Sequence, residues 1–242
     1  MKSLVGFHAV TSRLRQRPET VREIYIDAER NDARAKDLRR MAGSLNVRVI
    51  PVDGKRLDGM AGGARHQGVV AQAEPLKMPQ FIDDVLEGLK EPPLLLVLEG
   101  VQDPHNLGAC LRVADGAGAH AVIAPKDRSV GLTTAAIKVS SGASESVPYI
   151  VVTNLARTMR DLKEKGIWLI GADDSAPGSI FQAKLEGPLG LVLGAEGEGL
   201  RRLTKDSCDG LVSIPMMGSV ESLNVSVASG ICLYEARRRR LA

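Results

Sequence analysis

The polar side chains that could do chemistry gather in three segments of the chain, 101–107, 194–200 and 216–224. Each segment follows or ends an apolar run of strand length, and open α/β sheets bind their ligands at the carboxyl ends of their strands. Glycines in the second and third segments allow a ligand to approach the backbone closely. The sequence therefore predicts a ligand site formed by three strand-end loops of one sheet.

Several common chemistries lack their residues. The sequence contains no G-x-x-x-x-G-K-[ST] phosphate loop, no C-x-x-C or H-E-x-x-H pair, and no G-x-S-x-G nucleophile elbow. Its four histidines do not have metal-ligand spacing. No G-x-G-x-x-G follows the strand expected near residue 94, which disfavours dinucleotide folds and the common Rossmann-like methyltransferases. We therefore expect no metal, and His105 suits a turn as well as it suits a catalytic base.

Strands and helices that alternate from residue 94 onward must position the three segments. This alternation indicates an α/β fold with a mostly parallel sheet and helices on both faces. The first run, LLLVLEG, is apolar throughout, as expected for a strand covered on both sides. A helical pattern over 107–119 follows the first loop. The predicted strands are 94–100, 120–125, 167–173, 188–197 and 211–217.

The third segment runs into a predicted terminal helix over 222–240. Ser222 suits the N-cap position, because its hydroxyl can accept a hydrogen bond from a backbone N–H of the first turn. Apolar residues recur at helical spacing and are expected to face the core. The expected stripe consists of Leu223, Val227, Gly230, Ile231 and Tyr234.

The N-terminal part predicts a compact α/β unit of its own. Its strand-like runs are VREIYID (21–27), NVRVIPV (46–52) and GVVAQAEP (68–75), and a charged helical pattern ends before Asn46. A proline-marked stretch then separates this unit from the sheet described above.

We expect a first domain at 1–73, a linker at 74–93 and a second domain at 94–242. The linker should contain a short amphipathic helix at 81–89.

Charge is unevenly divided along the chain. The net charge is +3, but residues 1–73 carry 14 Lys and Arg against 8 Asp and Glu, whereas residues 74–242 carry 18 against 21. The basic N-terminal part suggests a docking surface for a polyanion, although a solvated surface would have the same composition. Aromatic residues form 3% of the chain, which disfavours a stacking platform for single-stranded bases.

The chain has the composition of a soluble globular protein. No apolar run is long enough to span a bilayer, and the N-terminus lacks an apolar signal core. Three widely spaced cysteines argue against a disulfide framework. We therefore expect a cytoplasmic protein with no membrane partner.

The three segments resemble, in order, the three motifs of the SpoU branch of the SPOUT methyltransferases, also called the TrmH family. The resemblance is carried by DPHNLGACLRVADGAGA (103–119), LVLGAEGEGL (191–200) and SIPMMGSVESLNVSVASG (213–230), and it extends to APKDRS and TNLARTM. Any one motif would be a weak signal, but the three in this order are a strong one. The resemblance covers residues 94–242, and residues 1–73 are similar to the substrate-binding domain of the same family.

The resemblance implies a fold that the patterns alone do not predict. The second domain would have a deep C-terminal trefoil knot, and the first domain would be similar to L30/L7Ae-type folds. The active site would be completed near the interface of a homodimer. The implied reaction transfers a methyl group from S-adenosyl-L-methionine to the ribose 2′-hydroxyl of a guanosine in bacterial 23S rRNA.

The resemblance also assigns cofactor-binding residues. Gly194, Ile214 and Leu223 match the positions that hold the adenosine and methionine parts of the cofactor. Glycine at 194 allows close backbone approach, and the two apolar side chains can contact the adenine. Without the resemblance, core packing would be the better interpretation of Ile214 and Leu223.

Five further residues match the catalytic positions of the family. Arg112 matches the catalytic arginine of the family, but a guanidinium is effectively always protonated. Arg112 is therefore better suited to orient a ribose or phosphate through two hydrogen bonds than to act as a base. Glu198 matches the functional acid, with Glu196 as the alternative. The remaining predicted site residues are Asn106, which also suits a turn, Ser222, which also suits an N-cap, and Asn224.

The basic N-terminal part supplies candidate phosphate contacts, which would position RNA without specifying its sequence. The arginine run at 237–240 allows the same interpretation or a solvated one. The candidates in the first domain are Arg13, Arg15, Arg17, Arg39 and Arg40.

Two alternatives remain open from the sequence. The same chemistry could act on tRNA or on another rRNA site, although small tRNA-acting relatives typically lack a domain like residues 1–73. The protein could instead be a non-catalytic RNA-binding or ribosome-assembly factor. A non-catalytic role is disfavoured by the presence of all five predicted catalytic residues, Asn106, Arg112, Glu198, Ser222 and Asn224.

Overall fold

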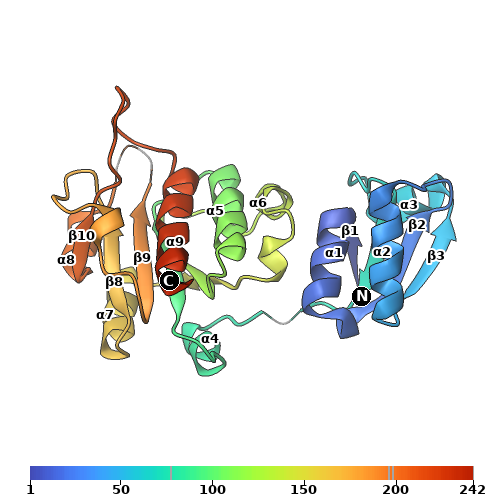
Figure 1. Ribbon diagram of the computed structural model, residues 1–242, viewed down its shortest axis with the longest axis horizontal. Helices are drawn as coiled ribbons and strands as arrows, with labels where there is room; N and C mark the ends of the chain where they lie inside the picture. The colour runs from blue at the N-terminus through green and yellow to red at the C-terminus, as the bar shows by residue number, and fades with distance from the viewer. Residues whose placement is uncertain (77, 196, 198, 242) are drawn as a thin grey trace. The chain divides into compact units, whose positions relative to one another are not determined.

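A computed structural model describes residues 1–76, 78–195, 197 and 199–241. The chain divides into two compact units, residues 1–77 and residues 78–242. Figure 1 shows the elements of each unit. The boundary falls inside the stretch predicted as a linker, and the helix predicted there, α4 (Ile82–Glu87), contributes Val85 to a core of the second unit.

The first unit is built on a four-stranded mixed sheet in the order β1-β4-β2-β3. β2 and β3 are parallel, and the other two pairs are antiparallel. Asp32 and Asp53 begin two of its helices by accepting hydrogen bonds from backbone N–H groups of the first turn. The elements are β1 (Lys2–Val5), α1 (Phe7–Gln16), η1 (Pro18–Thr20), β2 (Val21–Asp27), α2 (Ala33–Ser44), β3 (Arg48–Val52), α3 (Gly54–Ala61) and β4 (Val69–Ala73).

The second unit contains a six-stranded sheet in the order β10-β8-β9-β5-β6-β7. Every neighbouring pair of these strands is parallel, which agrees with the predicted α/β fold. The strands are β5 (Leu94–Glu99), β6 (Ala121–Pro125), β7 (Tyr149–Val152), β8 (Trp168–Ala172), β9 (Leu189–Gly194) and β10 (Gly210–Val212).

Helices cover both faces of this sheet (Figure 1) because β5 is apolar on both sides. Leu94 and Leu96 belong to the core under α5 and α9, whereas Leu95 and Val97 belong to the core under α7. The helices are α5 (Pro104–Gly116), α6 (Thr134–Val139), η2 (Ala143–Glu145), α7 (Leu155–Glu164), η3 (Ile180–Gln182), α8 (Arg202–Ser207) and α9 (Val225–Leu241).

The last predicted strand and the terminal helix need correction. β10 ends at Val212 instead of continuing to residue 217, and Ser213 forms only an isolated bridge with Ser179. Helix α9 begins at Val225, so Ser222 lies before the helix and is not its N-cap. The side chain of Asn224 instead accepts a hydrogen bond from the backbone N–H of Ser226, at 3.0 Å.

Two residues of the predicted apolar stripe of the terminal helix are exposed and do not face the core. Val227 is 51% exposed and Tyr234 is 54% exposed. The helix instead buries a face that includes polar residues, which hydropathy spacing alone does not select. The buried residues are Val225, Ser229, Cys232, Leu233, Glu235 and Ala236.

Among the described residues, no helix is long and apolar enough to cross a membrane. The same part of the chain contains no group of three or more His, Cys, Asp or Glu side chains that could hold a metal ion.

Candidate functional site

A cavity of about 370 Å³ lies where β8, β9 and β10 end. It is formed by the loops that follow these strands and by the start of α9, which agrees with the predicted site at the carboxyl ends of parallel strands. Four residues predicted for the site line it, namely Gly194, Ile214, Ser222 and Leu223. Ile214 and Leu223 are both half-buried, so they are available to a ligand and are not closed into the core.

Glycine is required where β9 enters its loop. A Cβ atom on Gly194 would lie 2.1 Å from the carbonyl carbon and oxygen of Gly199. Gly199 itself has a φ of +63° and donates a backbone hydrogen bond to Ala195 at 2.9 Å. The loop thus turns back on the strand and leaves backbone groups at the wall of the cavity, a form suited to a ligand held mainly by main-chain contacts.

An ion pair inside the cavity was not predicted from the sequence. Asp173, which follows β8, pairs with Lys205 of α8, and both residues line the cavity. Ser175 donates to the same carboxylate through its backbone N–H, at 3.1 Å, and through its hydroxyl. Burial alone would raise the pKa of Asp173, but the hydrogen bonds from Lys205 and Ser175 outweigh it and lower that pKa.

Glu99 holds the neighbouring helix against the end of β5. Its buried carboxylate accepts from the backbone N–H of Arg201, at 2.9 Å, and from the hydroxyl of Thr204, at 2.7 Å. These bonds fix the first residues of α8, which carries Lys205. Glu99 was also missed, although an acidic residue that ends an otherwise apolar strand run is a signal that could have identified it.

The two predicted asparagines meet. The Asn224 side-chain amide donates to Asn106 Oδ1 at 2.9 Å, which links the start of α9 to the first turn of α5. The side-chain oxygen of Asn224, Oδ1, accepts a hydrogen bond from the hydroxyl of Ser226 at 2.7 Å. Both asparagines are therefore oriented by neighbouring groups.

Arg112 is exposed on α5 and does not line the cavity. Within the described part of the chain, its guanidinium has no hydrogen bond or ion pair, so its donors are available to another molecule. Glu198 and its alternative Glu196 lie outside the described residues. The cavity, the asparagine pair and Arg112 are thus separate parts of the predicted site within one chain.

The candidate phosphate contacts of the first unit are not equivalent. Arg13 is 2% exposed, and its guanidinium donates to the hydroxyl of Thr20 and the carbonyl of Glu74, at 3.2 and 2.9 Å. Its burial contradicts the predicted phosphate contact. Arg39 is half-buried and donates to the carbonyl of Arg30. The remaining candidates are exposed, and they are Arg15, Arg17 and Arg40.

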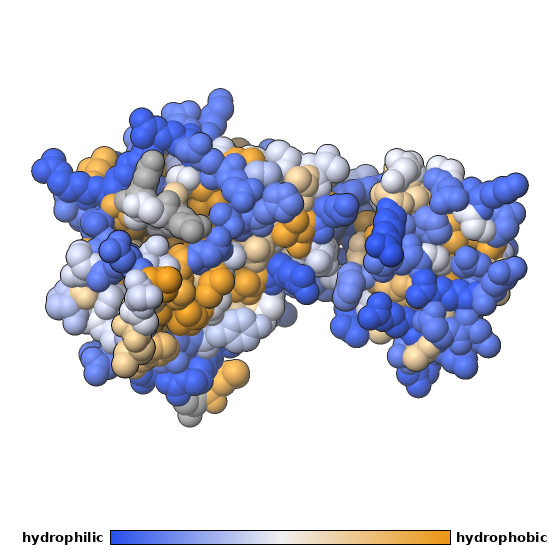
Figure 2. All heavy atoms as spheres, turned by 90° about the horizontal axis from the view of Figure 1, so that it is seen from above, coloured by the Kyte–Doolittle hydropathy of each residue, from blue (hydrophilic) through white to orange (hydrophobic). Residues whose placement is uncertain are grey.

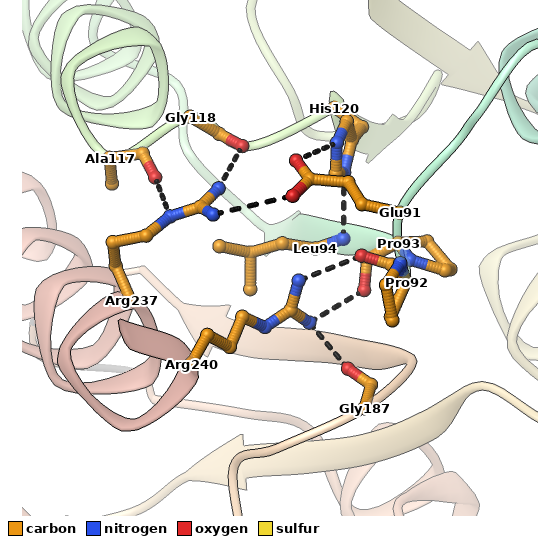
Figure 3. Close-up of polar contacts among 10 residues, drawn as sticks. All are labelled: Glu91, Pro92, Pro93, Leu94, Ala117, Gly118, His120, Gly187, Arg237 and Arg240. Carbon is orange, nitrogen blue, oxygen red and sulfur yellow. Dashed lines mark hydrogen bonds and ion pairs between the residues drawn. The ribbon is translucent and has the colours of Figure 1, made fainter. Parts of the chain in front are cut away.

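The arginine run at the end of α9 forms hydrogen bonds with other groups of the same chain. Arg237 donates to the carbonyls of Ala117 and Gly118, each at 2.8 Å. Figure 3 shows these contacts beside those of Arg240. Arg240 donates to the carbonyls of Pro92 and Pro93, at 2.7 and 2.8 Å, and to that of Gly187, at 2.5 Å. These two arginines therefore hold the amino-terminal end of the sheet together.

Comparisons with known proteins identify relatives of both units. The model of the SpoU rRNA Methylase family matches residues 93–234, and the model described as RNA 2′-O ribose methyltransferase substrate binding matches residues 3–79. A 23S rRNA (guanosine-2′-O-)-methyltransferase RlmB from Ralstonia nicotianae is 62% identical over 99% of this chain and 96% of its own length. The protein of the same name from Bordetella pertussis is 57% identical over 98% of this chain and 97% of its own length.

Solved structures have the same fold. The SpoU methyltransferase AviRb from Streptomyces viridochromogenes, in complex with the cofactor AdoMet, is 26% identical with a TM-score of 0.71, covering 99% of this chain and 90% of its own. The A. aeolicus TrmH/SpoU tRNA modifying enzyme is 26% identical with a TM-score of 0.57, and covers 66% of this chain and 82% of its own.

Proposed function

The chain belongs to the SpoU rRNA methylase family, and we propose that the strand-end cavity, the Asn106–Asn224 pair and Arg112 form its methyltransferase site. The protein transfers a methyl group from S-adenosyl-L-methionine to the ribose 2′-hydroxyl of a guanosine in 23S rRNA. The observation that carries this conclusion is the 62% identity to an RlmB over nearly the full length of both chains.

The cavity suits the cofactor. S-adenosyl-L-methionine supplies the methyl group as a sulfonium when it is bound. Ile214 and Leu223 offer apolar contact to the adenine, and Gly194 lines the cavity without a side chain, so its backbone is open to the ligand. Ser222 is exposed at the same cavity and offers a hydroxyl.

The ribose hydroxyl is a weak acid, so the protein must position it and stabilise the charge that develops on its oxygen. The guanidinium of Arg112 has hydrogen-bond donors and no acceptor, so Arg112 orients the ribose or an adjacent phosphate through paired hydrogen bonds. Asn224, oriented by Asn106 and Ser226, offers a polar group at the start of α9. Glu198 is assigned to the site by its motif alone.

The first unit binds the RNA. In support, the substrate-binding family model covers this unit, and Arg15, Arg17 and Arg40 are exposed there. Arg39 contributes from a half-buried position, whereas Arg13 is not part of this surface. We assign residues 1–73 to substrate binding, 74–93 to the linker and 94–242 to catalysis.

A second copy of the chain completes the site. Val227 and Tyr234 are exposed on α9, which packs beside α5, the helix of exposed Arg112. Figure 2 shows an apolar patch on the surface of the second unit, bordered by hydrophilic residues. Apolar patches with a polar border are typical of protein interfaces. Homodimers in solution, detected by analytical ultracentrifugation, are expected, and monomers at micromolar concentration would contradict this proposal.

Two features of the family fold are also proposed. The trefoil knot is supported by the path of the chain after β9, which goes to β10 at the sheet edge and returns through 213–224 to α9. The returning segment and the loop after Gly194 line one cavity. The mixed sheet of the first unit supports a likeness to L30/L7Ae folds.

The rRNA substrate supports a cytoplasmic location.

The function is tested with tritiated S-adenosyl-L-methionine and an unmodified 23S rRNA transcript, followed by primer extension at limiting nucleotide concentration. One labelled guanosine, absent with Arg112→Ala, is the expected result. Transfer to bulk tRNA alone would establish the tRNA alternative. RNA binding without transfer, to naked RNA and to pre-ribosomal particles, would establish a non-catalytic role.

A further inference from the structure

The Asp173–Lys205 pair is the polar feature of the cavity for which the family motifs give no role. Lys205 is the only cationic side chain among the described residues that line the cavity. Its side chain is 33% exposed, whereas that of Asp173 is 6% exposed. The lysine therefore stands at the rim, with its carboxylate partner in the wall.

Both partners are held in place by the surrounding fold. The backbone N–H of Asp173 donates to the carbonyl of Val212 in β10, at 2.9 Å, and Ser175 donates to its carboxylate. Lys205 lies on α8, whose first residues are bonded to Glu99. The ammonium group needs only one of its three N–H donors for Asp173, so its other donors can reach a ligand.

The sheet order indicates which part of the cofactor lies nearby. Asp173 follows β8 and is bonded to β10, the strand before Ile214, whereas Asn106 follows β5 on the other side of β9. The transferred methyl must face the Asn106 side, where the acceptor is positioned. The nucleoside must then lie on the Asp173 side, with its base against the apolar Ile214.

We propose that Lys205, positioned by Asp173, binds the ribose hydroxyls of S-adenosyl-L-methionine and thereby contributes to cofactor specificity. A lysine–carboxylate pair is complementary to a diol, because the ammonium donates to one hydroxyl oxygen while a hydroxyl donates to the carboxylate. This inference rests on the proposed function, since it assumes that the cavity holds the cofactor.

The test is isothermal titration calorimetry without RNA, with S-adenosylhomocysteine and its 2′,3′-dideoxyribose analogue as probes. The variant is Lys205→Met, which keeps the length of the side chain and removes the ammonium. Lys163→Met is the matched control, because Lys163 also pairs with a largely buried aspartate, Asp209, at 2.8 Å, and is 36% exposed. Lys163 does not line the cavity.

The wild-type protein is expected to bind the dideoxy analogue about tenfold more weakly than S-adenosylhomocysteine, as for a lost hydrogen bond to a charged group. Lys205→Met should bind S-adenosylhomocysteine about tenfold more weakly, and it should distinguish the two probes less than the wild type does, because only the contact to Asp173 remains. Lys205→Arg should recover part of the discrimination, and Lys163→Met should behave as the wild type.

Two outcomes would overturn the inference. Lys205→Met could bind S-adenosylhomocysteine as tightly as the wild type, or it could retain the full discrimination against the analogue. A wild-type protein that binds neither probe would instead contradict the proposed cofactor site. Circular dichroism of each variant separates loss of a ligand contact from loss of folding.

Discussion

At the scale of single residues, the proposed site gives Arg112 and the cavity separate tasks. Arg112 lies outside the cavity and has no partner among the described residues, so its donors are available to the RNA. Ile214 and Leu223 line the cavity, and their apolar side chains can contact only the cofactor. Substrate positioning and cofactor binding should therefore respond to different substitutions.

Arg112→Ala is expected to lower kcat by about 100-fold through loss of acceptor positioning. The Kd for S-adenosylhomocysteine should change little, because the side chain does not reach the cavity of its own chain. Arg112→Lys should rescue kcat poorly, since a lysine cannot form the planar, paired hydrogen bonds of a guanidinium. Single-turnover methyl transfer and calorimetry measure the two effects, and a variant with normal kcat would refute the assignment.

Gly194→Ala is expected to abolish detectable binding of S-adenosylhomocysteine. The added Cβ would meet the backbone of Gly199 at 2.1 Å, so the loop that walls the cavity must move. Gly131→Ala is the control, because a Cβ there meets nothing within 4 Å. Equal affinity of the two variants would show that the close approach at Gly194 is not needed for binding.

At the scale of elements, the start of β5 depends on a histidine outside the strand. His120 Nδ1 accepts from the backbone N–H of Leu94 at 2.9 Å, and Nε2 lies 3.0 Å from a carboxylate oxygen of Glu91. Figure 3 shows this group next to Arg237 and Arg240. The bond to Leu94 requires an unprotonated Nδ1, so the fold prefers the neutral imidazole.

Burial lowers the pKa of His120, and the nearby Arg240 and Arg237 act in the same direction, while Glu91 opposes them. The unfolded chain therefore takes up a proton at a higher pH than the folded chain. The stabilisation by His120 should be complete above the unfolded pKa of about 6.5 and should decrease as the pH falls below it.

This effect is measured as the difference in Tm between the wild type and His120→Asn from pH 8 to pH 5. The asparagine oxygen can replace Nδ1 as an acceptor but does not titrate in this range. The Tm of the wild type should fall by more than the Tm of the variant between pH 8 and pH 5. A constant difference across this range would contradict the linkage.

At the scale of the whole molecule, RNA binding is assigned to the first unit and chemistry to the second. Phosphate contacts release counterions, so each lost contact should reduce the slope of log affinity against log salt by about 0.7 to 0.9. The triple variant Arg15→Ala, Arg17→Ala, Arg40→Ala should therefore have a slope lower by about 2 to 3.

Filter binding of a 23S rRNA fragment at several salt concentrations measures this slope. Lys184→Ala, at an exposed position of the second unit, is the control and should retain the wild-type slope. S-adenosylhomocysteine binding should be unchanged in both variants. A triple variant with the wild-type slope would exclude these arginines from the RNA surface.

Local patterns were sufficient for much of the fold and for the position of the site. The end of a strand and the start of a polar loop depend on a few neighbouring residues, so they can be predicted from short segments of sequence. The apolar run of β5 and the glycines at the end of β9 are two such segments. The motifs in those loops likewise identified the family and the methyl-transfer reaction. Asn106 and Asn224 were predicted separately and are bonded to each other in the structure.

Burial and pairing between distant segments were decided only by the tertiary structure. Arg13 and Arg15 are alike in sequence, but the first is buried against Thr20 and Glu74 while the second is exposed. The Asp173–Lys205 pair joins a strand end to a helix with no shared motif. The apolar spacing of α9 did not identify its buried face, because that face includes the polar Ser229 and Glu235 while the apolar Val227 is exposed.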